Sequence, residues 1–224
     1  MCRLCCQNAV GDKSIAIYNS IDYNGDKKEV IKIITKICHI IVNFFIRKNI
    51  FPEEQREVYQ YGFELWVSSV IGILIVLAIG IISGRCFESI IFYIVFCFTR
   101  LFSGGLHAPT YLLCKISLAA VLLSVLAFDW LLCGIVEYYW YVLYLYSFII
   151  ICRFAPVENS NKRLTKHEKV RSKVICIIEM MIWLLVMILL NNLNSKLYHI
   201  VVLTLFSVAN LMLLGIVYER RKRQ

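Results

Sequence analysis

The sequence is poor in residues that interrupt regular structure, with three Pro and ten Gly among 224 residues. Few helix breakers leave little room for disordered linkers. No internal repeat of fixed period is present, which disfavours transporters built from repeated halves. The Cys and His spacing typical of zinc sites is also missing. The cluster of Cys2, Cys5 and Cys6 has neither a second Cys-x-x-Cys nor a His pair beside it. We therefore expect no metal and no other cofactor.

Long apolar runs are what the sequence does contain. Hydrophobic residues make up 60% of the chain, whereas soluble domains hold about 45–50%. Runs of this length predict an all-α integral membrane protein with about six transmembrane or re-entrant helices and an N-terminal amphipathic helix. The expected spans are 65–83, 89–104, 116–133, 136–152, 174–191 and 197–217.

Composition divides the chain into four parts. They are a polar extension at 1–27, amphipathic or interfacial helices at 28–64, a polytopic domain at 65–217 and a basic tail at 218–224. Residues 28–48 place apolar and basic residues on opposite faces at helical spacing, which suits a helix on the membrane surface. Docking on the protein itself is the alternative. Pro52 followed by Glu53 and Glu54 is typical of a helix start.

The net charge of +9 comes from cations beside the apolar runs. With both termini cytoplasmic and six alternating spans, 22 of the 24 Lys and Arg lie on the inner side, and only Arg85 and Lys196 lie outside. The positive-inside rule therefore predicts cytoplasmic termini and a cytoplasmic 153–173 loop. The cations indicate contact with an anionic lipid bilayer. The sequence shows no pattern of basic and aromatic residues typical of a nucleic-acid groove, so we do not expect nucleic acid as a partner.

Residues 100–115 hold the groups best suited to chemistry. His107 and Cys114 are seven positions apart, and an imidazole can take the proton that a thiol must lose to become a nucleophile. On one straight helix these positions are about 10.5 Å apart along the axis. Gly104-Gly105 and Pro109 break that helix and let His107 fold back toward Cys114. Arg100 adds positive potential, although its guanidinium could simply reach the interface.

Arg100, Gly104, Gly105, His107, Ala108 and Cys114 together resemble the signature of the accessory gene regulator B (AgrB) family. Members of this family are bacterial membrane peptidases of quorum sensing. Two flanking segments resemble it as well, YQYGFELW at 59–66 and APVENSNKRL at 155–164. The resemblance extends from about residue 30 to 217 and is most specific at 100–114.

The resemblance implies that Cys114 is the nucleophile and His107 the general base of a cysteine endopeptidase. Arg100, Gly104 and Gly105 would support them. The substrate would be a small autoinducing peptide precursor, cut near its C-terminal end and cyclised as a thiolactone in a bacterial cell membrane. The active site would face the cytoplasm. Virulence regulation is a further expectation carried by the resemblance.

Other assignments are less direct. Glu64 and Glu158 are candidates for a third catalytic residue. Lys162, Arg163, Lys166 and Lys169 could dock an acidic tail on the precursor or could serve topology alone. A homo-oligomer is a further possible assembly. A small peptide transporter or exporter is the alternative function, and a structural membrane partner with an incidental His and Cys is the third.

Overall fold

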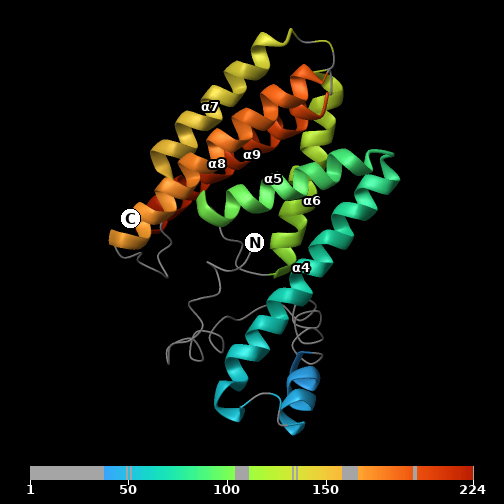
Figure 1. The fold of residues 1–224 in the computed structure, drawn as a ribbon, viewed down its shortest axis with the longest axis vertical. Coiled ribbons are helices and arrows are strands. Elements are labelled where there is room, and N and C mark those ends of the chain that lie inside the picture. The colour runs from blue at the N-terminus through green and yellow to red at the C-terminus, as the bar shows by residue number, and fades with distance from the viewer. Residues whose placement is uncertain are drawn as a thin grey trace. The chain divides into compact units, whose positions relative to one another are not determined.

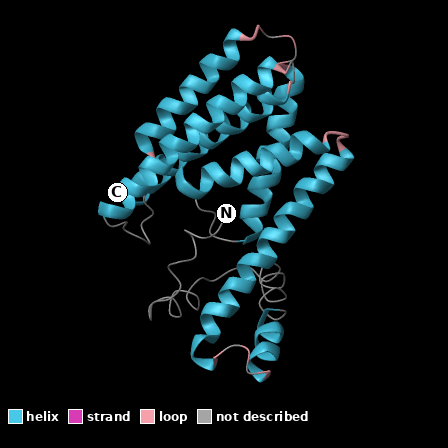
Figure 2. Cartoon of the chain, in the orientation of Figure 1, coloured by secondary structure: helices cyan, strands magenta, loops and turns pink. Residues whose placement is uncertain are grey.

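The computed structural model describes residues 38–48, 50, 52–103, 111–132, 134, 136–157, 166–193 and 196–223. Every regular element in these ranges is a helix, as Figure 2 shows. This confirms the expected all-α fold. The 1–27 extension and residues 28–37 of the expected amphipathic helix lie outside the described residues.

The chain divides into two compact units at Gly72 and Ile73. In the first, a helix at Cys38–Arg47 precedes the 3-10 helix η1 (Glu53–Gln55) and the start of α4 (Arg56–Ile82). Pro52 stands at the N-cap of η1, and the acids predicted for the first turn occupy it. Arg56 Nη2 donates to Asn43 Oδ1 at 2.7 Å, which ties the short helix to α4.

The second unit contains the last residues of α4 and five further helices. These are α5 (Cys86–Ser103), α6 (Tyr111–Leu131), α7 (Tyr138–Phe154), α8 (Lys166–Asn192) and α9 (Leu197–Arg223). Over the whole described chain, five helices are long and apolar enough to cross a membrane: Val58–Ile82, Cys86–Ser103, Leu112–Leu131, His167–Asn192 and Leu197–Tyr218. With 17 residues, α7 is near the short limit of about 17 for a crossing. The six expected apolar helices are therefore present.

Helix α9 is the centre of the second unit. It contacts α5, α6, α7 and α8, and Figure 1 shows α7, α8 and α9 lying side by side. Of its span, 56% is buried, against at most 33% in the other four spans. Outward apolar side chains such as Leu185 and Leu189 remain exposed. Such a surface is what lipid tails cover, so the chain is a multi-pass membrane protein.

Two ends of this helix cluster can be distinguished by their contacts. At one end, Val157 N, just after α7, donates to Ser103 O in the last turn of α5 at 3.1 Å. At the other end, the turn between α4 and α5 meets the end of α6 and the start of α9 through Arg85, Asp129 and His199. Helices α6 and α8 also begin at the first end, which contains the predicted site residues Arg100 and Cys114.

Candidate functional site

The structure describes two of the five residues predicted to form or support the catalytic site. Arg100 lies in the last turn of α5, and Cys114 lies in the first turn of α6. Gly104, Gly105 and His107 lie outside the described residues. Helix α5 ends at Ser103 and α6 begins at Tyr111, and the predicted break between them lies outside the described residues.

Cys114 is partly buried. Tyr93 and Cys97 of α5 lie within electrostatic range of its thiol. Residues 93 and 97 are one helical turn apart, so they share the face of α5 that meets α6. The nucleophile predicted from sequence thus sits in a sulfur-rich and aromatic setting that only helix packing reveals.

Arg100 lies where a cation is favoured. Its guanidinium carbon is 5.6 Å from the centroid of the Phe96 ring on the preceding turn, within the range of a cation–π contact. A cation in the last turn also complements the negative end of the helix dipole. Both effects lower the cost of holding Arg100 at the end of an apolar span.

The basic residues predicted to dock substrate are only partly described. Lys162 and Arg163 lie outside the described residues, and Lys166 is the first residue of α8. Lys169, Arg171 and Lys173 follow in the same helix and are exposed. Cations at a helix start oppose the helix dipole, so their placement favours a role in topology or in binding an anionic partner.

Two residues were predicted as a third catalytic group, Glu64 and Glu158. Glu64 belongs to the first unit, where Gln60 donates to Glu64 Oε1 at 3.4 Å. Glu158 lies outside the described residues. Both assignments stay predictions.

Sequence reasoning missed a polar group inside the membrane span of α8. Glu179 lies close to the middle of His167–Asn192, and Trp183 Nε1 donates to Glu179 Oε1 at 3.2 Å. Helix α5 packs against α8, and the Thr99 hydroxyl of α5 is buried without a hydrogen bond. An acidic residue within an apolar run is the signal that could have found it, because such residues are costly in a bilayer.

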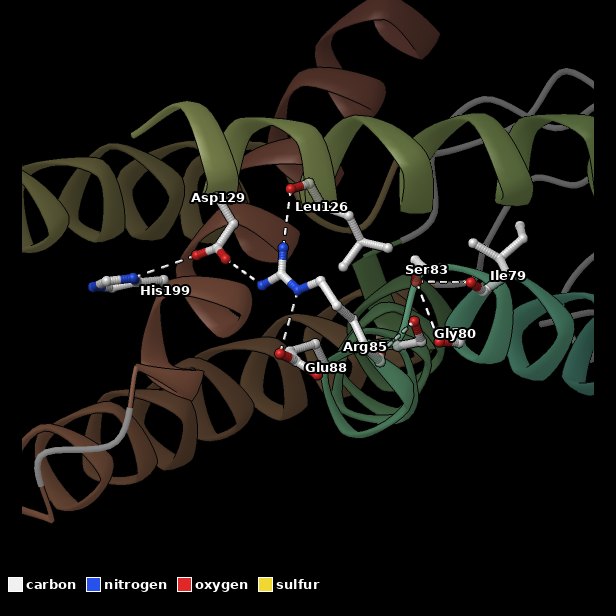
Figure 3. A network of polar contacts seen from close by, with 9 residues as sticks. Ile79, Gly80, Ser83, Arg85, Glu88, Leu126, Asp129 and His199 are labelled. Carbon is white, nitrogen blue, oxygen red and sulfur yellow. Dashed lines mark hydrogen bonds and ion pairs between the residues drawn. The ribbon is translucent and has the colours of Figure 1, made fainter. Parts of the chain in front are cut away.

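At the other end, four helices share a polar network (Figure 3). Arg85 pairs with Asp129 of α6 through Nη2 and donates to Leu126 O at 3.1 Å. Asp129 Oδ1 lies 3.3 Å from His199 Nδ1 of α9. His199 in turn stacks on Trp140 of α7, with ring centroids 4.1 Å apart.

Arg85 is the hub of this network. Its Nε donates to Glu88 Oε1 at 3.3 Å. Burial acts to lower the pKa of the Arg85 guanidinium, but the carboxylates of Asp129 and Glu88 outweigh burial and raise that pKa. The cation is therefore fixed in its charged form by its partners.

Comparison with known proteins assigns the chain to a family. The family profile described as Accessory gene regulator B matches residues 38–216. A protein of Clostridium perfringens (strain SM101) named AgrB-like is 27% identical over 168 residues, which cover 69% of this chain and 78% of that relative. A second, from C. perfringens strain 13, is 28% identical over 132 residues.

That second match covers 55% of this chain and 61% of the relative. No solved structure matches the chain. The profile covers the Arg100–Cys114 signature, the first five apolar helices and most of α9. With the match extending over most of its length, the chain belongs to the accessory gene regulator B family.

Proposed function

We propose that this protein is a membrane cysteine endopeptidase of quorum sensing, which cleaves a small peptide precursor and promotes its cyclisation. The observation that carries the proposal is the match of the family profile across a signature whose two described members are Arg100, in the last turn of α5, and Cys114, in the first turn of α6. His107 stands between these helices in the sequence.

The first chemical step forms an acyl-enzyme. His107 takes the proton of the Cys114 thiol, and the thiolate attacks a precursor carbonyl carbon. The carbon–nitrogen bond breaks, the leaving amine receives the proton from His107, and a thioester joins the precursor to Cys114. Positive potential from Arg100 favours the thiolate over the thiol.

The second step moves the acyl group without water. A thiol of the precursor attacks the thioester, its proton passes to the Cys114 sulfur, and a thiolactone leaves. One thioester replaces another, so bond energy is nearly conserved and exclusion of water decides the product. The apolar face of α5 around Phe92, Val95 and Phe96 is fully buried, which supports a site with little water nearby.

Charge supports a cytoplasmic site and an acidic substrate. The helix ends near Arg100 and Cys114 belong to the side that holds 22 of 24 cations if the termini are cytoplasmic. The exposed Lys169, Arg171 and Lys173 at the start of α8 could attract an acidic precursor tail. A peptide exporter is the alternative function, and it requires no reactive pair at His107 and Cys114.

The test is co-expression of precursor with Cys114→Ser and His107→Ala variants, read by mass spectrometry. Each change should reduce cleavage by at least about 10³-fold, because nucleophile and base act as a unit. The variants should still insert in the membrane. Cutting at the parent rate by Cys114→Ser would remove the nucleophile assignment. Export of an uncut precursor that depends on the protein would favour the transporter.

A further inference from the structure

The short helix at Cys38–Arg47 packs on the start of α4 through one of its faces. The Phe45 ring is stacked on Phe63 of α4, with ring centroids 6.0 Å apart. Arg56 Nη2, in the first turn of α4, donates to Asn43 Oδ1 at 2.7 Å. Figure 1 shows the short helix, in blue, beside the first turns of α4. One side of the short helix is therefore fixed by the protein itself.

The opposite side of the short helix is apolar and exposed. On the packed side, Cys38 and Val42 are 0% and 1% exposed, whereas Ile40 and Phe44 are 67% and 56% exposed. Each exposed residue follows a buried one by two positions, which is slightly more than half a turn at 3.6 residues per turn. The helix thus has a packed face and, across its axis, a second face with two large apolar side chains.

The level of the exposed face in the membrane follows from α4. Helix α4 runs unbroken from Arg56 into a candidate membrane span that begins at Val58. The short helix contacts α4 at Arg56, just before that start, and at Phe63, which is about 7.5 Å beyond it by the rise of an α-helix. The short helix therefore lies at the level where α4 enters the membrane.

The exposed charges near this helix are ordered as a membrane surface requires. Arg47 and Lys48, at the end of the helix, are exposed, and the exposed acids Glu53 and Glu54 follow in η1. Long cationic side chains can keep their stems on an apolar surface while the charge reaches the phosphates. Carboxylates lack that reach and belong in water. Apolar side chains, then cations, then acids is the order met on leaving a bilayer.

We propose that the exposed face of the Cys38–Arg47 helix binds lipid. Ile40 and Phe44 contact the acyl chains of the leaflet that α4 enters, and Arg47 and Lys48 contact its phosphates, while the packed face holds the helix on α4. A helix with an apolar face at this level is typical of an interfacial helix. Under the predicted orientation this is the inner leaflet. The helix thereby sets the depth at which α4 begins.

The test measures depth with the full-length protein in phospholipid vesicles. Ile40→Cys and Phe44→Cys are made one at a time in a background without native Cys, and each thiol receives a nitroxide. EPR then compares collisions with oxygen, which concentrates in lipid, and with a nickel complex that stays in water. Both positions should favour oxygen over nickel.

Two further positions calibrate the measurement. Leu74→Cys gives the lipid reference, because Leu74 is 59% exposed within the span of α4. Glu54→Cys gives the water reference, because Glu54 is exposed in η1 and outside the span. The oxygen preference at positions 40 and 44 should lie between these references, since an interfacial helix reaches only about 5–10 Å below the headgroups.

A matched pair of variants tests the contact with phosphates. Replacing Arg47 and Lys48 by Gln should shift the nitroxide at position 44 toward water in vesicles that contain phosphatidylglycerol, because two attractions to anionic headgroups are lost. Replacing Glu53 and Glu54 by Gln should cause no such shift. An unchanged position 44 in the first variant, or an equal shift toward water in the second, would remove the phosphate contact from the proposal.

A preference for nickel at position 40 or 44 would place this face in water and overturn the lipid contact. Slow collision with both reagents would show that protein covers the face, which would overturn it as well. If the background without Cys does not fold, the parent protein in vesicles is irradiated with a phospholipid that carries a diazirine on its acyl chain. Adducts on Ile40 and Phe44 are then expected, and adducts confined to the spans would contradict the proposal.

Discussion

The two ends of the helix cluster use polar groups differently. Around Arg85, four helices meet in a network that joins Arg85 to Glu88, Asp129 and Leu126 O and Asp129 to His199, although Asp129 Oδ1 and Trp140 Nε1 make no hydrogen bond. Around the last turn of α5, the Thr99 hydroxyl is buried without a hydrogen bond and Arg100 lies over an aromatic ring. One end is held by ion pairs between helices, and the other places a cation over the Phe96 ring of its own helix.

This difference separates stability from chemistry. Ion pairs between helices specify how the helices pack, because breaking them leaves charges unpaired in an apolar setting. The other end contains the residues of the proposed peptidase site, Arg100 and Cys114. We therefore expect changes at the Arg85 end to affect folding and changes at the Cys114 end to affect reactivity.

The largest expected effect is on thiol labelling from outside the cell, which should be all-or-none because each end of the helix cluster lies on one side of the membrane. Ser160→Cys, Asn194→Cys and Gln224→Cys are made one at a time in a background without native Cys. A membrane-impermeant maleimide added to intact cells should label position 194 and miss positions 160 and 224, because 22 of the 24 cations then lie inside.

Permeabilised cells provide the control, in which all three thiols should react. Labelling of position 160 from outside would reverse the orientation. It would also move Arg100 and Cys114 away from the cytoplasm, and with them the proposed access of a cytoplasmic precursor.

Breaking the network should have the next largest effect. Asp129→Ala leaves Arg85 and His199 without their shared carboxylate. Buried pairs cost about 3–5 kcal/mol to break, and because the Arg85 side chain is 26% exposed, we expect about 2 kcal/mol. Thermal unfolding in detergent should show a Tm lower by several degrees, with Cys114 alkylation of the folded protein unchanged.

Glu88→Gln is the matched control, because Glu88 lies at the edge of the network with one contact at 3.3 Å and 25% exposure. Its loss should be below about 1 kcal/mol. A normal Tm for Asp129→Ala together with slow alkylation of Cys114 would contradict the division into a folding end and a reactive end.

At the reactive end, the basic segment should affect binding more than chemistry. Replacing Lys162, Arg163, Lys166 and Lys169 by Gln should weaken precursor binding about tenfold, if each exposed pair contributes about 0.3–0.4 kcal/mol. The difference should shrink at high salt, because the Debye length falls from about 10 Å at 0.1 M to about 3 Å at 1 M. A pull-down at both salt concentrations measures it.

The matched control replaces four cations of the basic tail by Gln, which removes the same charge from the same expected cytoplasmic side: Arg220, Arg221, Lys222 and Arg223. That variant should bind as the parent does. If both variants bind the precursor as well as the parent at low salt, the cations of the 153–173 loop determine only the membrane topology. Slow alkylation of Cys114 in the loop variant would instead tie the loop to the active site.

The sequence predicted the apolar helices better than their ends. Apolar runs locate spans directly, but the helix that contains the expected 174–191 span begins earlier, at Lys166, and the helix that leads into the expected 65–83 span begins at Arg56, close to the start expected at Pro52. Helical hydrogen bonding continues through polar residues, where hydropathy carries no signal. For the candidate site, spacing and resemblance pointed to Arg100 and Cys114, whereas the burial of Thr99 on α5 depends on which helices pack together.

The smallest expected effect sharpens the comparison at two glycines of α4. A Cβ on Gly80 would lie 3.0 Å from Ser89 Cβ and 3.1 Å from Cys86 Cα, whereas a Cβ on Gly62 would meet nothing within 4 Å. Gly80 O also accepts from Arg85 N at 2.8 Å, so Gly80 belongs to the close-packed network end.

Gly80→Ala should lower stability by about 1 kcal/mol, since overpacking costs about 1–3 kcal/mol and the better helix propensity of Ala returns up to about 1 kcal/mol. Gly62→Ala should raise stability by up to about 1 kcal/mol for the same propensity reason. Both are read as Tm shifts in detergent. Adding Ser89→Gly to Gly80→Ala removes the side chain that the new methyl meets, so the double variant should be more stable than the sum of the two single losses predicts. Strict additivity would show that the α4 and α5 backbones move apart freely, and the network end would then be no more rigid than the reactive one.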